Sequence, residues 1–269
     1  MTTNTSQLNR TSERNWSAGL GNLSRMETAK WVKTRQGVIH LGLWMLIING
    51  LMAIIISTAG EELEAGQTIV SASIDPFIGI TSWFTAIGVS VIAMGAIVGE
   101  KRSGVAAWIL SAPVSRTAYF TSKLAVIGFF SVVTMVVIPG FIVFAELSFI
   151  PTGADVGEVS ILPWIATVGA LALNVVFYLS LTLFLGTVLS SRGAVVGIPI
   201  GFVFAGMFLG GVLPEGIAQL TPWAVVSPLA MELAEGAKDV TSYVPAIASA
   251  AWTVALIGAS IWRFKREEF

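Results

Sequence analysis

The sequence predicts an all-α polytopic membrane protein with six transmembrane helices. The chain is 55% hydrophobic and only 12% charged, with a mean hydropathy of +0.82, whereas a soluble domain is about 25% charged. Its apolar residues form stretches long enough to cross a bilayer core, which takes roughly 20 residues. The charged residues alternate in sign between successive gaps, and this alternation predicts a membrane topology.

The basic residues define the predicted topology. Fourteen of the fifteen Lys and Arg residues lie in four segments, at residues 10–35, 101–123, 192 and 263–266, and Lys238 is the exception. Eleven of the sixteen Asp and Glu residues lie in or beside the other gaps. Because cytoplasmic loops are rich in Lys and Arg, we expect the four basic segments and both termini to be cytoplasmic, in a multi-pass protein of the cell (cytoplasmic) membrane.

The apolar stretches give six expected spans, which are in chain order residues 38–59, 77–98, 124–149, 163–189, 194–213 and 244–262. An even number of spans places both termini on one side, as the basic residues require. The predicted organisation is a cytoplasmic tail at residues 1–37, one transmembrane domain at residues 38–262 and a second cytoplasmic tail at residues 263–269.

The tail before the first span contains a predicted interfacial amphipathic helix at about residues 24–35. Ser24 and Glu27 have the spacing of a capping box, in which both side chains bond to backbone groups at a helix start. Trp31 among Lys and Arg residues suits a helix that lies at the membrane surface. A plain positively charged anchor is the alternative.

The loop at residues 99–123, between the second and third spans, is too long for a tight turn. Its apolar residues fall at the spacing of one face of a short helix, and they are Val105, Trp108, Ile109 and Ala112. We expect Pro113 to end this helix and Ser115 to cap the next one. An apolar face outside the lipid favours burial in the groove of a partner, and a helix lying on the surface is the alternative.

The predicted spans contain almost no charge. Glu146, at the outer end of the third span, is the nearest exception. A central charge costs about 2.5–3.5 kcal/mol on insertion scales, so its absence argues against a pump or symporter that moves ions through buried carboxylates. Pro139 and Pro199 lie within the third and fifth spans, and they should kink both helices.

Small and polar residues in the spans have two interpretations. Gly193, Gly197 and Gly201 recur every four residues along the fifth span, a spacing that lets helices approach closely in lipid. They serve either packing within one subunit, or a dimer interface or transport path. Asn49 and Asn174 are the most polar central residues, and they either bond to neighbouring helices or contact a substrate.

Composition and missing motifs restrict the function classes. The chain has no Cys and a single His, His40, so it has no thiolate site and no multi-histidine metal or haem site. It lacks a Gly-x-Ser-x-Gly motif, although a Ser–Lys arrangement stays open. It also lacks the Gly-x-x-x-x-Gly-Lys-Ser/Thr loop that cradles nucleotide phosphates. The net charge of −1 suggests no nucleic-acid partner.

The loop at residues 99–123 resembles the cytoplasmic loop of ABC-2 type permeases. The residues that carry the resemblance are Glu100, Gly104, the stretch Leu110-Ser-Ala-Pro-Val-Ser-Arg116, and Lys123. Val105 stands where the family commonly has Thr. The resemblance extends over about residues 24–262, and it implies short re-entrant extracellular helices before the last span. Thr221-Pro222 and Ser227-Pro228 provide two helix starts in that segment.

The resemblance implies a non-catalytic permease subunit of an ATP-driven transporter, mostly an exporter in this family. The coupling site on a separate ATPase would involve Glu100, Arg102, Gly104, Val105, Trp108, Ile109, Pro113 and Arg116. The chain itself would bind no cofactor, with ATP and Mg on the partner ATPase. The expected assembly has two ATPase copies and a second permease copy, as a homodimer. An ATP-independent channel or a scaffold subunit is the alternative, and the substrate is not predicted.

Overall fold

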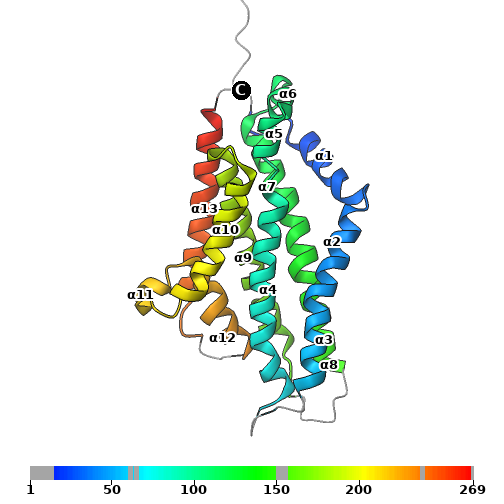
Figure 1. Ribbon diagram of the computed structural model, residues 1–269, viewed down its shortest axis with the longest axis vertical. Helices are drawn as coiled ribbons and strands as arrows, with labels where there is room; N and C mark the ends of the chain where they lie inside the picture. Colours follow the sequence, from blue (N-terminus) through cyan, green and yellow to red (C-terminus); the bar gives the residue numbers. More distant parts are fainter. Residues whose placement is uncertain (1–14, 60–62, 64–66, 150–156, 237–239, 268–269) are drawn as a thin grey trace, which may run out of the picture.

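Six helices in the part of the chain that the structure describes are long and apolar enough to cross a membrane (Figure 1). The computed structural model describes residues 15–59, 63, 67–149, 157–236 and 240–267, and this part of the chain contains no β-strand. The spans are Gln36–Ala59, Ile69–Arg102, Arg116–Phe149, Ile161–Val188, Arg192–Leu209 and Val244–Lys265. The predicted all-α architecture with six spans is therefore confirmed.

Several spans contain more than one helical element. The first three spans are built from α2 (Gln36–Trp44), η1 (Met45–Asn49), α3 (Gly50–Ala59), α4 (Ile69–Ala93), α5 (Val98–Arg102), α7 (Arg116–Val132), η2 (Val133–Val137) and α8 (Ile138–Phe149). The last three spans are α9 (Ile161–Val188), α10 (Arg192–Leu209) and α13 (Val244–Lys265). The shorter elements are α1 (Leu20–Val32), α6 (Val105–Ser111), α11 (Glu215–Ala218), η3 (Pro222–Val225), η4 (Val226–Ala230) and α12 (Met231–Ala234).

Two spans begin earlier than their apolar stretches predict. Helix α4 starts at Ile69 because Thr68 and Ser71 form a capping box, with the Thr68 hydroxyl accepting from the Ser71 N–H at 3.2 Å. Asp75 therefore lies inside the helix. Helix α7 starts at Arg116 because the Ser115 hydroxyl accepts from a backbone N–H of the first turn, which confirms Ser115 as a cap. Caps extend both helices beyond the apolar residues.

The helix before the first span differs from the prediction. Helix α1 covers Leu20–Val32 instead of residues 24–35, and it follows Gly19, which has a left-handed φ of 82°. Ser24 lies inside the helix, so the predicted capping box is wrong. Glu27 instead bonds to a lysine of the third span. The position of α1 therefore depends on its packing against the third span.

Two π-helical turns, η1 and η2, interrupt the first and third spans. Turn η2 ends two residues before Pro139, which lacks a backbone N–H donor and favours such a distortion. The Asn49 amide, from η1, donates to the Pro139 carbonyl at 3.0 Å. Helix α10, by contrast, remains one helical element through Pro199.

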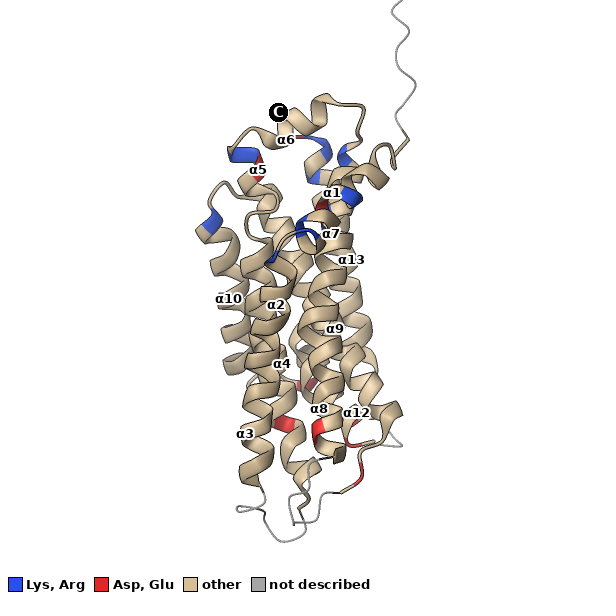
Figure 2. Ribbon diagram, turned by 90° about the vertical axis from the view of Figure 1, so that its right-hand side faces the viewer, with Lys and Arg blue, Asp and Glu red and all other residues tan. Residues whose placement is uncertain are grey.

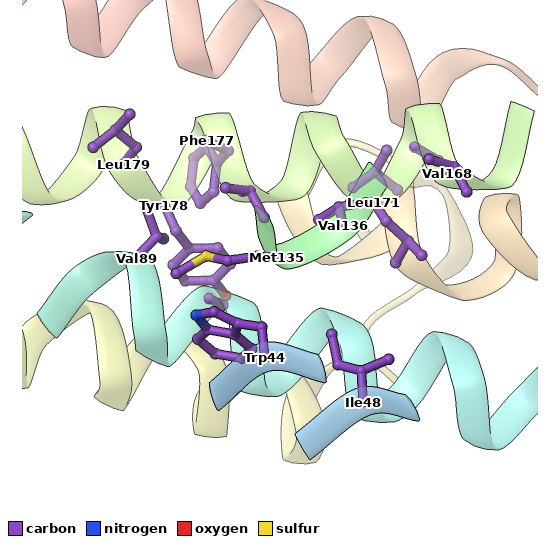
Figure 3. Packing of buried hydrophobic residues seen from close by; sticks show 14 of the residues in the cluster. Trp44, Ile48, Val89, Met135, Val136, Val168, Leu171, Phe177, Tyr178 and Leu179 are labelled. Carbon is purple, nitrogen blue, oxygen red and sulfur yellow. The ribbon is translucent and has the colours of Figure 1, made fainter. Parts of the chain in front are cut away.

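Helix α9 forms the centre of the bundle and contacts α4, α7, α10 and α13. Figure 3 shows part of the buried core, in which Tyr178 and Leu179 of α9 lie near Val89 of α4 and Met135 of η2. Trp44 also belongs to this core, and its ring lies directly over the backbone of Gly88 in α4. A Cβ at Gly88 would lie 2.2 Å from that ring, so only glycine permits this contact.

The segment between α10 and α13 forms the expected short helices. Turn η3 begins at Pro222, with Thr221 as its N-cap residue, and a further helical turn follows at Pro228 after the extended residue Ser227. Val225 and Leu229 are buried in the core. The segment therefore packs onto the bundle, and its re-entry into the membrane stays a prediction.

The two ends of the bundle differ in charge. Figure 2 shows that Lys and Arg gather at the end that carries α1, α5, α6 and the last turn of α13. Glu27, Glu100 and Glu267 pair with lysines there, whereas other acidic residues lie near α8 and α12 at the other end. We call the first the basic end and the second the opposite end. The charge separation read from the sequence is thus also spatial, and the cytoplasmic location of the basic end stays a prediction.

Candidate functional site

The loop at the basic end contains two short helices instead of one. Helices α5 and α6 are separated at Ser103 and Gly104, and Gly104 has a φ of 75°, a left-handed conformation that glycine adopts at low cost. We expected one short helix in this loop; α6 is that helix, and the preceding α5 was not predicted. Helix α6 ends at Ser111, and the extended residue Ala112 precedes Pro113, as expected for a residue before proline.

Helix α6 presents part of its apolar face to the outside. Trp108 is 74% exposed and Val105 is 40% exposed, whereas Ala106 on the opposite side of the helix is fully buried. Ile109 is partly buried and packs against the hydrophobic core. The predicted apolar stripe is therefore divided, because Ile109 holds the helix onto the bundle and Trp108 projects from it. In Figure 1, α6 forms the tip of the basic end.

A buried ionic cluster lies directly beneath this loop. The Nζ of Lys123, which is only 2% exposed, lies 2.9 Å from Glu27 Oε1 and 2.7 Å from Glu100 Oε1. The Tyr119 hydroxyl donates to Glu100 Oε2 at 2.6 Å. Lys30 completes the group, 2.9 Å from Glu27. We call these five residues the Lys123 cluster, and they join α1, α5 and α7.

The charge on Lys123 favours the ionised form of Glu27. Burial raises the pKa of the Glu27 carboxyl, but the attraction and hydrogen bond of Lys123, helped by Lys30, outweigh burial and leave the pKa below its ordinary value. Glu27 is therefore ionised near neutral pH. The same lysine holds Glu100, so the start of the loop is tied to the third span and not free in solution.

Arg116 joins the loop to the last helix. Its guanidinium donates to the backbone carbonyls of Lys265, at 2.8 Å, and of Glu267. These carbonyls end α13, where a cation is favoured by the helix dipole. Lys101 adds an ion pair with Glu267 and donates to the Thr187 carbonyl at 3.2 Å. The loop is thus braced against three spans.

The structure separates the predicted coupling residues into two sets. Arg102, Gly104, Val105, Trp108 and Pro113 are exposed at the basic end. Glu100 and Arg116 bond within the chain, and Ile109 packs against the core. The partners of Glu100 were not predicted, because Glu27 has the spacing of a capping box and no local pattern in the sequence pairs Tyr119 or Lys123 with Glu100.

The residues predicted for a dimer interface or transport path also fall into two groups, one buried and one exposed. Asn49 is buried within the bundle and bonds to Pro139, which agrees with the helix-bonding interpretation. Gly193, Gly197 and Gly201 are all exposed on α10, and a Cβ at either of the last two would meet no atom within 4 Å. The glycines therefore do not serve packing against the described residues of this chain.

Comparison with known families agrees with this geometry. The model of a family described as ABC-2 family transporter protein matches residues 55–264 of the chain. The chain belongs to the ABC-2 transporter family. The resemblance read from the loop is thereby confirmed, and the protein is a multi-pass membrane protein of the permease type. Comparison with curated proteins gives no match.

Proposed function

We propose that this ABC-2 family permease is the non-catalytic transmembrane subunit of an ATP-driven exporter, coupled through the α5–α6 loop to a separate ATPase subunit. The observation that carries the proposal is Trp108, which is 74% exposed at the tip of the basic end. A large aromatic side chain on a short, braced helix suits the groove of a partner, because buried aromatic anchors dominate interface energies.

The bracing contacts explain how such a helix could transmit force. Glu100 is tied to Lys123 in the third span, and Arg116 is tied to the end of α13. A displacement of α6 by the ATPase would therefore pass into two spans and, through Glu27, into α1. In this proposal Glu100 and Arg116 position the loop, and Arg102 orients it through charge.

The proposed complex contains two ATPase copies, which carry ATP and Mg, and two permease copies as a homodimer. It lies in the cell membrane with both chain termini and the basic end in the cytoplasm. The exposed glycines of α10 support this face as the dimer contact, because small residues permit close helix packing in lipid.

Replacement of Trp108 tests the coupling. We expect Trp108→Asp to reduce ATPase capture by about 30-fold, since loss of a central aromatic anchor costs about 2 kcal/mol or more. Trp108→Phe keeps an aromatic ring and should retain most of the binding. The measurements are pull-down of the ATPase and transport in vesicles. If Trp108→Asp leaves both unchanged, the loop is not a coupling element, and an ATP-independent channel or scaffold becomes the better interpretation.

Replacement of Gly197 tests the dimer. A Cβ at Gly197 would meet no described atom within 4 Å, so the Gly197→Leu protomer should fold normally while the dimer dissociates. Gly258→Leu is the matched control, because Gly258 is equally unobstructed but lies on α13. Native mass spectrometry gives the copy number. A Gly197→Leu protein that remains dimeric would exclude the glycine face of α10 from the interface.

A further inference from the structure

A cavity of about 470 Å³ lies among α4, α9, α10 and the short helices that follow α10. Those short helices belong to the opposite end of the bundle, away from α5 and α6 (Figure 1). The volume falls within the range of small-molecule sites, about 300–1,000 Å³. The cavity is therefore large enough for an organic ligand and separate from the coupling loop.

The buried side of the cavity is polar. Ser82, Asn174 and Tyr178 line it, and all three are nearly inaccessible to solvent. The Asn174 amide donates to the Ser82 carbonyl at 3.2 Å, which joins α9 to α4 beside the cavity. Such convergent polar groups in an otherwise apolar wall are typical of binding sites.

Two tryptophans line the cavity. The Trp223 ring is fixed, since its Nε1 donates to the Phe202 carbonyl at 3.0 Å and a Cβ at Gly206 would lie 2.5 Å from it. Trp83 is half-exposed on α4. Indole rings attract cations through the negative face of the ring, and a fixed ring does so without loss of side-chain entropy.

The charge of the cavity lining is negative. Glu215 and Glu232 both line the cavity, and none of the described lining residues is Lys or Arg. Glu232 is held in place, because its Oε2 accepts from the Thr241 N–H at 2.9 Å. Glu215 is exposed at the start of α11. Two carboxylates and two indole rings in the lining of one cavity favour a positively charged ligand.

We propose that this cavity binds an amphipathic organic monocation, with its charge between the carboxylates and the indole rings and its apolar part against α4 and α10. Asn174 and Tyr178 would then set the depth to which the ligand enters. The inference that such a cation is the transported substrate rests on the proposed transport function. Binding of the cation to the cavity does not depend on the ATPase.

Binding of tetraphenylphosphonium to the full-length chain in lipid nanodiscs tests the proposal, with empty nanodiscs subtracted. Its anionic counterpart of similar shape, tetraphenylborate, separates charge recognition from hydrophobicity. We expect the cation to bind at least about tenfold more tightly than the anion, and Trp83→Ala to weaken cation binding about tenfold. Equal binding of the two ions after subtraction would overturn the proposal.

Carboxylate variants identify the site. Glu215→Gln, at an exposed position, should fold normally and weaken cation binding, and adding Glu232→Gln should weaken it further, to about tenfold. Glu235→Gln is the control, because Glu235 is an acid of the same segment outside the cavity lining. Unchanged binding in Glu215→Gln, or an equal loss in Glu235→Gln, would refute the assignment. The Trp108→Asp chain should bind the cation normally, so a failure of coupling is distinguishable from a failure of this site.

Discussion

Removal of the Lys123 charge should destabilise the basic end strongly. The Nζ of Lys123 is 2% exposed and lies within 2.9 Å of both Glu27 and Glu100, whose side chains are themselves mostly buried. Lys123→Met would leave two carboxylates close together without their cation. Breaking a buried ion pair by removing one partner costs about 3–5 kcal/mol. Lys30 remains nearby and compensates in part, so we expect a loss of about 3 kcal/mol.

Thermal unfolding of the full-length chain in detergent measures this effect. A loss of about 3 kcal/mol corresponds to a decrease in Tm of about 5 °C for a chain of this size. Lys30→Met is the matched control. Lys30 carries the same charge in the same cluster but is 53% exposed, so its loss should cost at most about 1 kcal/mol.

A double variant separates the ionic contribution from simple packing. Glu27→Gln combined with Lys123→Met removes one of the stranded carboxylates, so the double variant should lose at least about 1 kcal/mol less than the sum of the two single losses. The reasoning is refuted if Lys123→Met and Lys30→Met shift the Tm equally. Strict additivity of the double variant would also contradict it, because the pair would then not interact.

Three further predictions concern packing, pH and topology. Gly88→Val should destabilise the bundle by about 3 kcal/mol through overpacking. Gly79 lies in the same helix, but a Cβ there would meet no described atom within 4 Å, so Gly79→Val should cost less in the same unfolding assay. The pKa of Glu27 is lowered in the folded state, so ionised Glu27 stabilises the fold above its ordinary pKa of 4.5, and this stabilisation is lost as the pH falls below 4.5. The Tm should therefore decrease on acidification below pH 4.5, and it should decrease less in Glu27→Gln. The chain has no Cys, so Gln67→Cys should react with an impermeant thiol reagent in intact cells and Ser103→Cys should not, and the reverse pattern would invert the topology.

The sequence alone determined the features that depend on neighbouring residues. The number of spans follows from apolar stretches of sufficient length, and the separation of charge follows from alternating loops. The cap at Ser115 and the end of α6 before Pro113 depend on side chains within a few residues. The family followed from the loop motif, and the family match over residues 55–264 confirms it.

Tertiary structure decided which remote groups meet. Glu27 could bond to backbone groups of its own helix or pair with Lys123, which is 96 residues away in the chain. The packing of α1 on α7 brings Glu27 next to Lys123 and so determines which of the two forms. Arg116 likewise finds its acceptors only because the fold places the C-terminal end of α13, with the carbonyls of Lys265 and Glu267, beside it. Hydropathy and capping are properties of adjacent residues, whereas an ion pair needs two segments brought together by the fold. The bracing of the loop therefore depends on helix packing, which local sequence patterns do not specify.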